Sequence, residues 1–310
     1  MAENNQLMGQ NKPEEVKQAL DQLFVLAKKY RTSGEYYQLI RFVSSFRFYS
    51  PFNAMLIHTQ LPGATFVASA SRWVYHYKRR IKPASRPLVI LQPMGPVMFV
   101  FDVSDTESGP DSVQLPLQVD RPFDVRGGNI GNEFFDLLEN AKRDGVRIEF
   151  LKAGAQSAGS IRSIESNGYK PQKVFNGKNS DKKDIYIDVN VRYLISVNET
   201  HKKEAQFVTV LHELAHLYCG HVGTPDKKWW PDRHWVDHSI KELEAESIAY
   251  IVCSRFGIDN PSEKYLSGYV KDHDNMPDLS MERIMKAAGL IEEMCRTRMK
   301  ARENPGRVKK

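Results

Sequence analysis

Two histidines four residues apart, within an otherwise mostly apolar helical segment, constrain this chain more than any other sequence feature. Residues 204–219 read EAQFVTVLHELAHLYC. Positions four apart project to one side of a helix, so His212 and His216 can hold one metal ion between them. Glu213 lies at the edge of that face, where its carboxylate can reach a metal-associated water without binding the metal. The pattern therefore predicts a helix with a buried apolar stripe and a catalytic zinc site.

A catalytic zinc ion normally takes a third protein ligand and leaves its fourth position open. The next predicted helix, about residues 238–256, carries Glu242 and Glu246 on one face. One of them can bind the metal while the other orients a ligand histidine. Glu244 lies on another face and is expected to be solvated. We predict one Zn²⁺ per chain, with another divalent metal as the alternative.

Other histidines compete for roles at this site. His221 follows His216 by five residues, whereas the metzincin pattern HExxHxxGxxH places its third histidine six residues after the second, so that pattern fails. His234 and His238 precede the glutamate-bearing helix and could donate to a transition-state oxyanion. The alternative is that both are surface histidines in a loop.

The front half of the chain segregates its charges. No Asp or Glu occurs from Tyr36 to Phe101, whereas residues 102–124 contain six acids and one base. Cations interleave with aromatic residues in the acid-free stretch, which suits contact with phosphates and stacking on unpaired bases. The alternative is an aromatic core with a solvated cationic face. The candidate contacts with single-stranded DNA are Arg41, Arg47, Tyr49, Arg72, Trp73, Lys78, Arg79, Arg80 and Lys82.

The chain is expected to form two α+β domains. Its 310 residues exceed the usual length of one domain. The reversal of charge and the glycines at 126–132 place a boundary near residue 125, giving domains 1–125 and 126–310. The apolar periodicities predict strands over 64–101, 147–151 and 184–190, and helices over 14–30, 36–49, 50–60, 131–145, 200–219, 238–256 and 281–302.

The chain shows no apolar leader and no apolar run long enough for a membrane span. Its three cysteines, Cys219, Cys253 and Cys295, fit neither a disulfide framework nor a metal knuckle. These features predict a soluble cytoplasmic protein with buried reduced thiols and no membrane partner.

The second half resembles the ImmA/IrrE-like zincin metallopeptidases. The resemblance rests on HELAH at 212–216, ELEAE at 242–246 on the next helix, and the alternating strand DIYIDVN ahead of the active helix, and it covers about residues 128–257. It implies a zincin-like fold in which His212, His216 and Glu242 hold the metal and Glu213 is the catalytic base. Glu246 stands where Asn or Asp is commoner in the family, and its implied role is support of a ligand histidine.

The first half resembles the N-terminal single-stranded-DNA-binding domain of ArdC-type antirestriction proteins. The residues that carry this likeness are SPFNAMLIHTQLPGATFVASASRW and RPLVILQP, and the family joins such a domain to a zincin domain in the same order. A glycine-bearing turn usual in the family is replaced here by YKRRIKP at 77–83. The resemblance implies a metallopeptidase-like protein that binds single-stranded DNA in antirestriction or the protection of mobile DNA.

Two alternatives remain at the level of sequence. One is a regulatory metalloprotease that cleaves a repressor or another protein partner, with DNA localising or activating it. The other is a non-catalytic DNA-binding protein with a structural metal. A structural site usually closes with four protein ligands and has no need of a glutamate at position 213, which argues against the second alternative.

Overall fold

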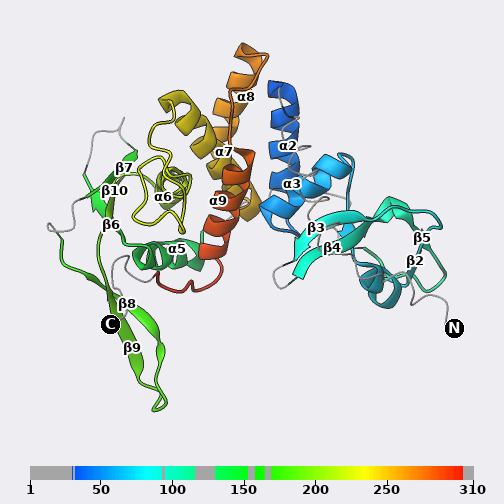
Figure 1. Cartoon of the computed structure of the whole chain (residues 1–310), viewed down its shortest axis with the longest axis horizontal. Coiled ribbons are helices and arrows are strands. Elements are labelled where there is room, and N and C mark those ends of the chain that lie inside the picture. Colours follow the sequence, from blue (N-terminus) through cyan, green and yellow to red (C-terminus); the bar gives the residue numbers. More distant parts are fainter. Residues whose placement is uncertain are drawn as a thin grey trace. The chain divides into compact units, whose positions relative to one another are not determined.

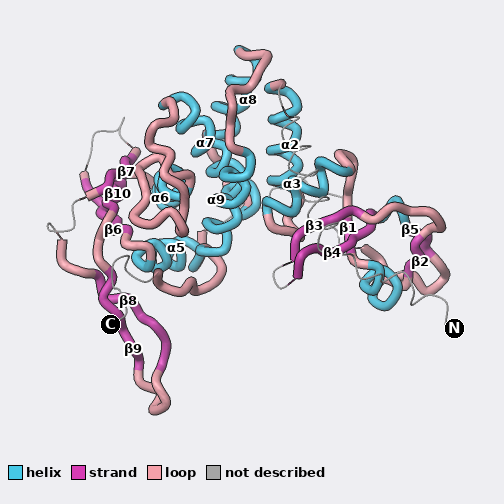
Figure 2. Tube along the Cα trace, in the orientation of Figure 1, coloured by secondary structure: helices cyan, strands magenta, loops and turns pink. Residues whose placement is uncertain are grey.

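The computed structural model describes residue 30 and residues 32–92, 95–115, 130–152, 158–164 and 169–302. The chain is an α+β protein that divides into two compact units, Met1–Asp124 and Val125–Lys310, at the position where the charge pattern places a boundary (Figures 1 and 2). The helix predicted over 14–30 lies outside the described residues, except for residue 30. Within the described ranges, no helix combines the length and apolarity needed to cross a membrane.

Unit 1 begins with two helices, α2 (Ser33–Ser45) and α3 (Pro51–Gln60). Thr32 caps α2 in a reciprocal capping box with Glu35, and the Ser50 side chain caps α3, which has proline at its first position. Helix α3 matches the predicted segment 50–60, whereas α2 begins three residues before the predicted segment 36–49 and ends four residues before its end. The sequence therefore encodes their starting points in local hydrogen bonds as well as in apolar spacing.

A small antiparallel sheet follows in the order β1-β4-β3, formed by Val67–Ala68, Gly95–Asp102 and Leu88–Gln92. Helix α3 covers the edge of β3 with two side-chain amides. Asn53 exchanges two hydrogen bonds with the backbone of Leu91, and Gln60 does the same with Val89. These amides occupy backbone groups that an edge strand would otherwise leave open.

The predicted strand around the first tryptophan is wrong. Residues Arg72–His76 form a π-helical turn, η1. The helical turn places Trp73 and Tyr77 together over Phe66, with ring centroids 5.5 Å from Phe66 in both cases, and the Trp73 indole N–H donates to the carbonyl of Phe101. An extended backbone would send neighbouring side chains to opposite faces, so burial of this cluster favours the helical turn.

The acidic segment of unit 1 folds back on the basic one. Strand β5 (Thr106–Ser108) pairs antiparallel with β2 (Arg79–Ile81), which sets Glu107 opposite Arg80. Between β4 and β5, a short 3-10 turn, η2 (Val103–Asp105), is capped by Asp102. Asp102 also accepts hydrogen bonds from the backbone N–H groups of Thr65 and Phe66. The cationic stretch is therefore partly balanced by the acids that follow it.

Unit 2 is built on a three-stranded sheet in the order β6-β10-β7. Its strands are Val146–Leu151, Tyr193–Asn198 and Gly159–Ser163, and β10 runs parallel to β6 and antiparallel to β7. The predicted strand DIYIDVN is β9 (Asp184–Val189), which pairs with β8 (Gln172–Lys178) in a separate hairpin that extends from the rest of this unit (Figure 1). The strand that precedes the active helix is therefore β10.

Helices cover this sheet and carry the candidate site. They are α5 (Asn132–Arg143), α6 (Lys203–Tyr218), α7 (His238–Phe256), α8 (Ser262–Asp272) and α9 (Met281–Met294). The final helix is shorter than predicted, because Asn140 of α5 donates to the carbonyls of Met294 and Thr297 and holds the chain in a non-helical path. The three cysteines are buried free thiols, as predicted.

Candidate metal centre

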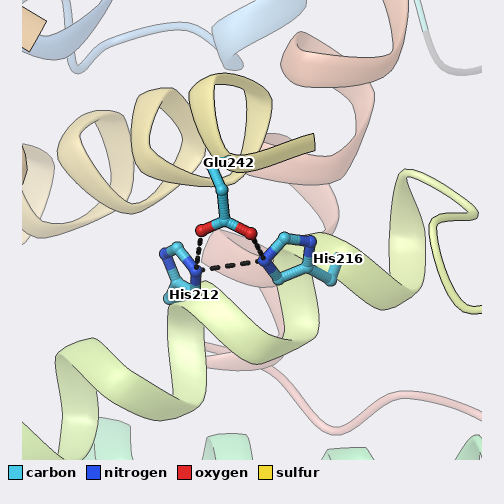
Figure 3. A group of neighbouring side chains, drawn as sticks. All are labelled: His212, His216 and Glu242. Carbon is cyan, nitrogen blue, oxygen red and sulfur yellow. Dashed lines mark hydrogen bonds and ion pairs between the residues drawn. The ribbon is translucent and has the colours of Figure 1, made fainter. Parts of the chain in front are cut away.

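Three side chains converge between α6 and α7. His212 and His216 project from one face of α6, and Glu242 projects toward them from α7 (Figure 3). The Nε2 atoms of the two histidines are 3.1 Å apart. One carboxylate oxygen of Glu242 is 3.4 Å from Nε2 of His212, and the other is 3.3 Å from Nε2 of His216. The structure thus brings together the three predicted ligands.

These distances suit a metal ion. Ligand atoms at roughly 2 Å from one tetrahedral Zn²⁺ lie about 3.3 Å from each other. The two imidazole nitrogens are 3.1 Å apart, close to that value, and each has a different oxygen of Glu242 at 3.4 or 3.3 Å. One donor atom from each of the three residues lies within 4.8 Å of the other two. Two imidazoles and one carboxylate are also a donor set that zinc takes in catalytic sites. The residues present therefore fit a single zinc ion.

The charged and titratable groups at the site shift one another's pKa values. Hydrogen bonds from His212 and His216 hold the pKa of the Glu242 carboxyl well below its usual range. Burial by itself would lower the pKa of His212, but the hydrogen bond to Glu242 and the charges of Glu246 and Glu213 outweigh it and raise that pKa. The carboxylates make this a locally anionic site suited to a cation.

Glu213 lies at the rim of the same site and is buried. Burial raises the pKa of its carboxyl, while the two ligand histidines act in the opposite direction. A hydrogen bond from the backbone of Ile161 on β7 orients the carboxylate. A buried glutamate with a raised pKa is the type of group that accepts a proton efficiently near neutral pH.

Glu246 and His238 flank the three converging residues. Glu246 lies 3.5 Å from Nδ1 of His212, whereas Glu242 and His216 lie near Nε2 of the same ring. His238 lies 3.5 Å from Glu242 and has a largely exposed side chain. His234 is also exposed and pairs with Asp232.

Glu244 is not solvated, contrary to the prediction, because its side chain is completely buried. It accepts two hydrogen bonds of 2.7 Å from Arg233, one of 2.9 Å from the backbone of Ser280, and lies 2.9 Å from Nε2 of His221. These contacts lower the pKa of Glu244 to about 2 even though burial alone would raise it. His221 in turn lies 2.9 Å from Nδ1 of His216. The His221 contact lies behind the ligand cluster and was not predicted.

A pocket of about 870 Å³ opens onto the site. Its lining includes the three converging residues and Glu213 together with Gly159 and Ile161 of β7. Strand β7 lies so close to α6 that a Cβ atom at Gly159 would stand 2.5 Å from the methyl group of Thr209. Glycine at this position allows the strand to approach α6.

The pocket side of β7 presents backbone groups that do not face β10. Toward β10, the carbonyl of Ala158 accepts from Asn198 and the N–H of Ile164 donates to Arg192. Because backbone groups alternate in direction along an antiparallel strand, those of Gly159 and Ile161 point away from β10. The hydrogen bond from Ile161 to Glu213 agrees with that direction.

The candidate DNA contacts of unit 1 differ in accessibility. Trp73 is fully buried, so its assignment as a stacking residue is wrong. Tyr49 and Arg79 are partly buried and donate to Val67 and Thr106, respectively, and Lys82 is exposed but donates to the carbonyl of Ser104. Arg47 is also partly buried. The exposed candidates, apart from Lys82, are Arg41, Arg72, Lys78 and Arg80.

Two aromatic residues that were not among the candidates are better placed to stack on bases. Tyr75 is 76% exposed and Phe48 is 48% exposed. Tyr75 lies on the turn η1 with the buried Trp73 and the exposed Arg72. In a strand, Trp73 and Tyr75 would lie on the same face, whereas in a helical turn they lie on different faces. The sequence was interpreted as a strand here, so it gave no reason to separate the two residues.

Comparison of the chain with protein-family models, with curated proteins and with solved structures gives no match.

Proposed function

We propose that unit 2 is a zinc-dependent metallopeptidase with a zincin-like fold, similar to the ImmA/IrrE-like enzymes. The observation that carries the proposal is the convergence of His212, His216 and Glu242 at distances suited to one zinc ion. Glu213 stands beside them at the rim of a pocket large enough for a peptide segment. A merely structural metal would not account for this glutamate or for the pocket.

In the proposed hydrolysis, the metal and Glu213 have different roles. When bound, a zinc ion would polarise the scissile carbonyl and acidify a water molecule. Glu213 accepts the proton of the attacking water at a carboxylate oxygen and later delivers it to the leaving amine. Its burial and the bond from Ile161 hold the carboxylate in place for both transfers.

The outer edge of β7 is the proposed binding site for the substrate backbone. An extended peptide can add to a free strand edge through main-chain hydrogen bonds. The outward groups of Gly159 and the carbonyl of Ile161 would pair with such a peptide and carry it past Glu213. This mode predicts that affinity depends on an extended main chain of several residues more than on one side chain.

Unit 1 is proposed to bind single-stranded DNA, as in ArdC-type antirestriction proteins. The exposed cations Arg72, Lys78 and Arg80 and the exposed ring of Tyr75 support this role, because such groups contact phosphates and stack on unpaired bases. The combined activity would serve antirestriction or the protection of mobile DNA. A regulatory protease localised by DNA is the second candidate, favoured by the buried, raised-pKa Glu213, which binding alone does not require.

The experiment is a cleavage assay on the full chain. Zinc-loaded protein is incubated with a peptide mixture, with and without single-stranded DNA, and the products are identified by mass spectrometry. We expect cleavage that disappears with a chelator, returns with zinc, and falls by several orders of magnitude in Glu213→Gln. Equal cleavage by wild type and Glu213→Gln would contradict the proposed role of Glu213, and no cleavage under either condition would favour a binding protein.

A further inference from the structure

We propose that His221 is a positioning residue for the metal ligand His216, and that Glu244 and Arg233 hold His221 in place. The inference rests on the proposed function, because it assigns a role relative to a metal ligand. It concerns a buried chain of contacts that runs from α6 through the following loop to α7. Of these residues, His216 and His221 also line the pocket, whereas Glu244 and Arg233 do not.

When a metal occupies Nε2 of His216, the hydrogen-bond geometry determines which ring nitrogens carry protons. Nε2 of His216 faces His212 and Glu242, so it must be unprotonated to bind a metal. Its proton is then on Nδ1, which donates to Nδ1 of His221 at 2.9 Å. His221 must consequently carry its own proton on Nε2, and that N–H donates to Glu244 at 2.9 Å. Each N–H in the hydrogen-bond chain from His216 through His221 to Glu244 therefore meets an acceptor.

Glu244 is a fixed end point for this chain. Arg233 binds both of its oxygens in a fork of two 2.7 Å bonds, and the backbone of Ser280 donates to it at 2.9 Å. The loop that delivers Arg233 depends on Gly220, whose positive φ of 82° and close approach to Pro231 exclude a side chain. The loop, α7 and the residue preceding α9 thus meet at one carboxylate, which leaves His221 little freedom to rotate.

The same residues could be considered as a second metal site, because Cys219, His221 and Glu244 lie close together and are buried. The contacts of Glu244 argue against that reading. A carboxylate has about four lone-pair positions, and His221, the two bonds from Arg233 and the Ser280 N–H use them. A cation here would also face the guanidinium of Arg233. The cluster is therefore a support and not a second centre.

The two ligand histidines are supported unequally. His216 is backed by side chains of His221 and Glu244 that are essentially inaccessible to solvent, at hydrogen-bond distances. His212 is backed by Glu246 at 3.5 Å, and that side chain is partly exposed. Residues that orient a metal-bound histidine typically contribute about 10- to 100-fold in affinity. We therefore expect the larger loss when the support of His216 is removed.

The test uses two substitutions of His221 that differ in whether they keep an acceptor for the Nδ1–H of His216. In His221→Asn the side-chain oxygen can take the place of Nδ1 and accept from His216, whereas His221→Leu removes the acceptor. Zinc affinity is measured on the full chain by competition with a chelator, and the visible spectrum of the Co²⁺-loaded protein reports the ligand geometry. His234→Leu is the control, because the side chain of His234 is exposed and pairs with Asp232.

We expect His221→Leu to weaken zinc binding by about 10- to 100-fold and to change the Co²⁺ spectrum, with His221→Asn recovering most of the affinity and His234→Leu unchanged. Wild-type affinity and spectrum in a folded His221→Leu would overturn the inference alone, as would an Asn variant no better than Leu. Wild-type protein that binds no zinc would overturn the proposed function together with it.

A measurement on the wild type covers the case in which His221→Leu does not fold. Nitrogen-15 NMR of the histidine rings in the zinc-loaded full chain distinguishes protonated from unprotonated nitrogens. The inference requires a proton on Nδ1 of His216 and on Nε2 of His221. The opposite tautomer of either ring would overturn it.

Discussion

Glu242, Glu244 and Glu246 follow one another at intervals of two residues along α7, yet each meets a different environment. Glu242 lies between two histidines of α6, Glu246 lies behind one of them, and Glu244 is buried against a guanidinium. Rotation by about 200° between residues two apart in a helix explains why Glu244 separates from the other two. The role of each acid follows from what faces it.

His58 provides a prediction at the scale of one residue. It is buried on α3, its Nδ1 lies 2.7 Å from the hydroxyl of Tyr30, and burial lowers its pKa to about 4. In the unfolded chain the pKa is near 6.5, so the unfolded state takes up a proton first as the pH falls. The contribution of neutral His58 to stability is therefore present above pH 6.5 and is lost as the pH falls toward 4.

Denaturant unfolding of the full chain, followed at several pH values from 7 to 4, measures this effect. His58→Phe keeps an aromatic ring beside Phe42 but cannot be protonated, so its unfolding transition should depend less on pH over that window. His76, which is exposed in the same unit, gives the control: His76→Phe should retain the wild-type dependence. An identical dependence in His58→Phe and wild type would contradict the assignment.

At the scale of the elements, the approach of β7 to α6 shapes the site. A Cβ at Gly159 would lie 2.5 Å from Thr209 and 2.6 Å from the carbonyl of Ser196. Gly159→Ala must push the strand away from both α6 and β10, at a cost of about 1–3 kcal/mol by analogy with overpacked cores. Because the proposed metal ligands lie on α6 and α7, zinc binding should survive while the proposed peptide cleavage falls sharply.

Unfolding by denaturant and the peptide assay measure the two effects of Gly159→Ala. Gly268→Ala is the matched control, since nothing lies within 4 Å of a Cβ at that position of α8 and alanine favours the helix. If the two alanine variants prove equally stable and equally active, β7 does not have the packed position assigned to it.

The elements that sequence patterning predicts best are those whose signals are local. Apolar spacing indicates α3, α5, α6 and α7 at nearly their observed limits, and it indicates α2 with limits displaced by three to four residues. Strands β7 and β10 were not predicted, because their pairing partners are distant in sequence. Strand β8 and helix α8 were also not predicted, although their partners β9 and α7 are neighbours along the chain. The π-helical turn at Trp73 is decided by burial against Phe66, which no local pattern contains.

The same distinction applies to the candidate site. The spacing of His212 and His216 needs only helical geometry, so their shared face could be predicted. The pairing of Glu244 with Arg233 and the contact of His221 with His216 depend on how a loop folds back between two helices. The proposed ligands could therefore be predicted from the sequence, whereas the buried contacts of His221, Glu244 and Arg233 behind them could not.

At the scale of the whole molecule, the proposed functions belong to separate units, and unit 1 can be tested by salt dependence. Arg79 and Lys82, two of the predicted contacts, donate hydrogen bonds within the unit, so replacing them would also disturb its fold. The test therefore replaces the exposed residues Arg72, Lys78 and Arg80 together with Ala. Each lost phosphate contact should reduce the slope of log K against log salt by about 0.7 for a single strand. Tyr75→Ala should weaken binding and leave the slope unchanged.

Titration of a fluorescent single-stranded oligonucleotide with the full chain measures both effects. Substitution of Lys173, Lys178 and Lys183 on the β8–β9 hairpin, which removes the same charge from unit 2, should change neither affinity nor slope greatly. Glu213→Gln should bind DNA as wild type does. Equal affinity for duplex DNA, or no response to salt, would contradict the stacking model for unit 1.

Zinc content of the purified full chain is the measurement that tests the metal site most directly. Elemental analysis after zinc loading and dialysis should give one zinc per wild-type chain, none in His212→Ala or His216→Ala, and little in Glu242→Ala. Glu246→Ala should retain most of the metal, because Glu246 lies behind His212 and not among the ligand atoms. A wild-type chain without zinc, or one whose zinc survives replacement of both histidines, would contradict the proposed metallopeptidase.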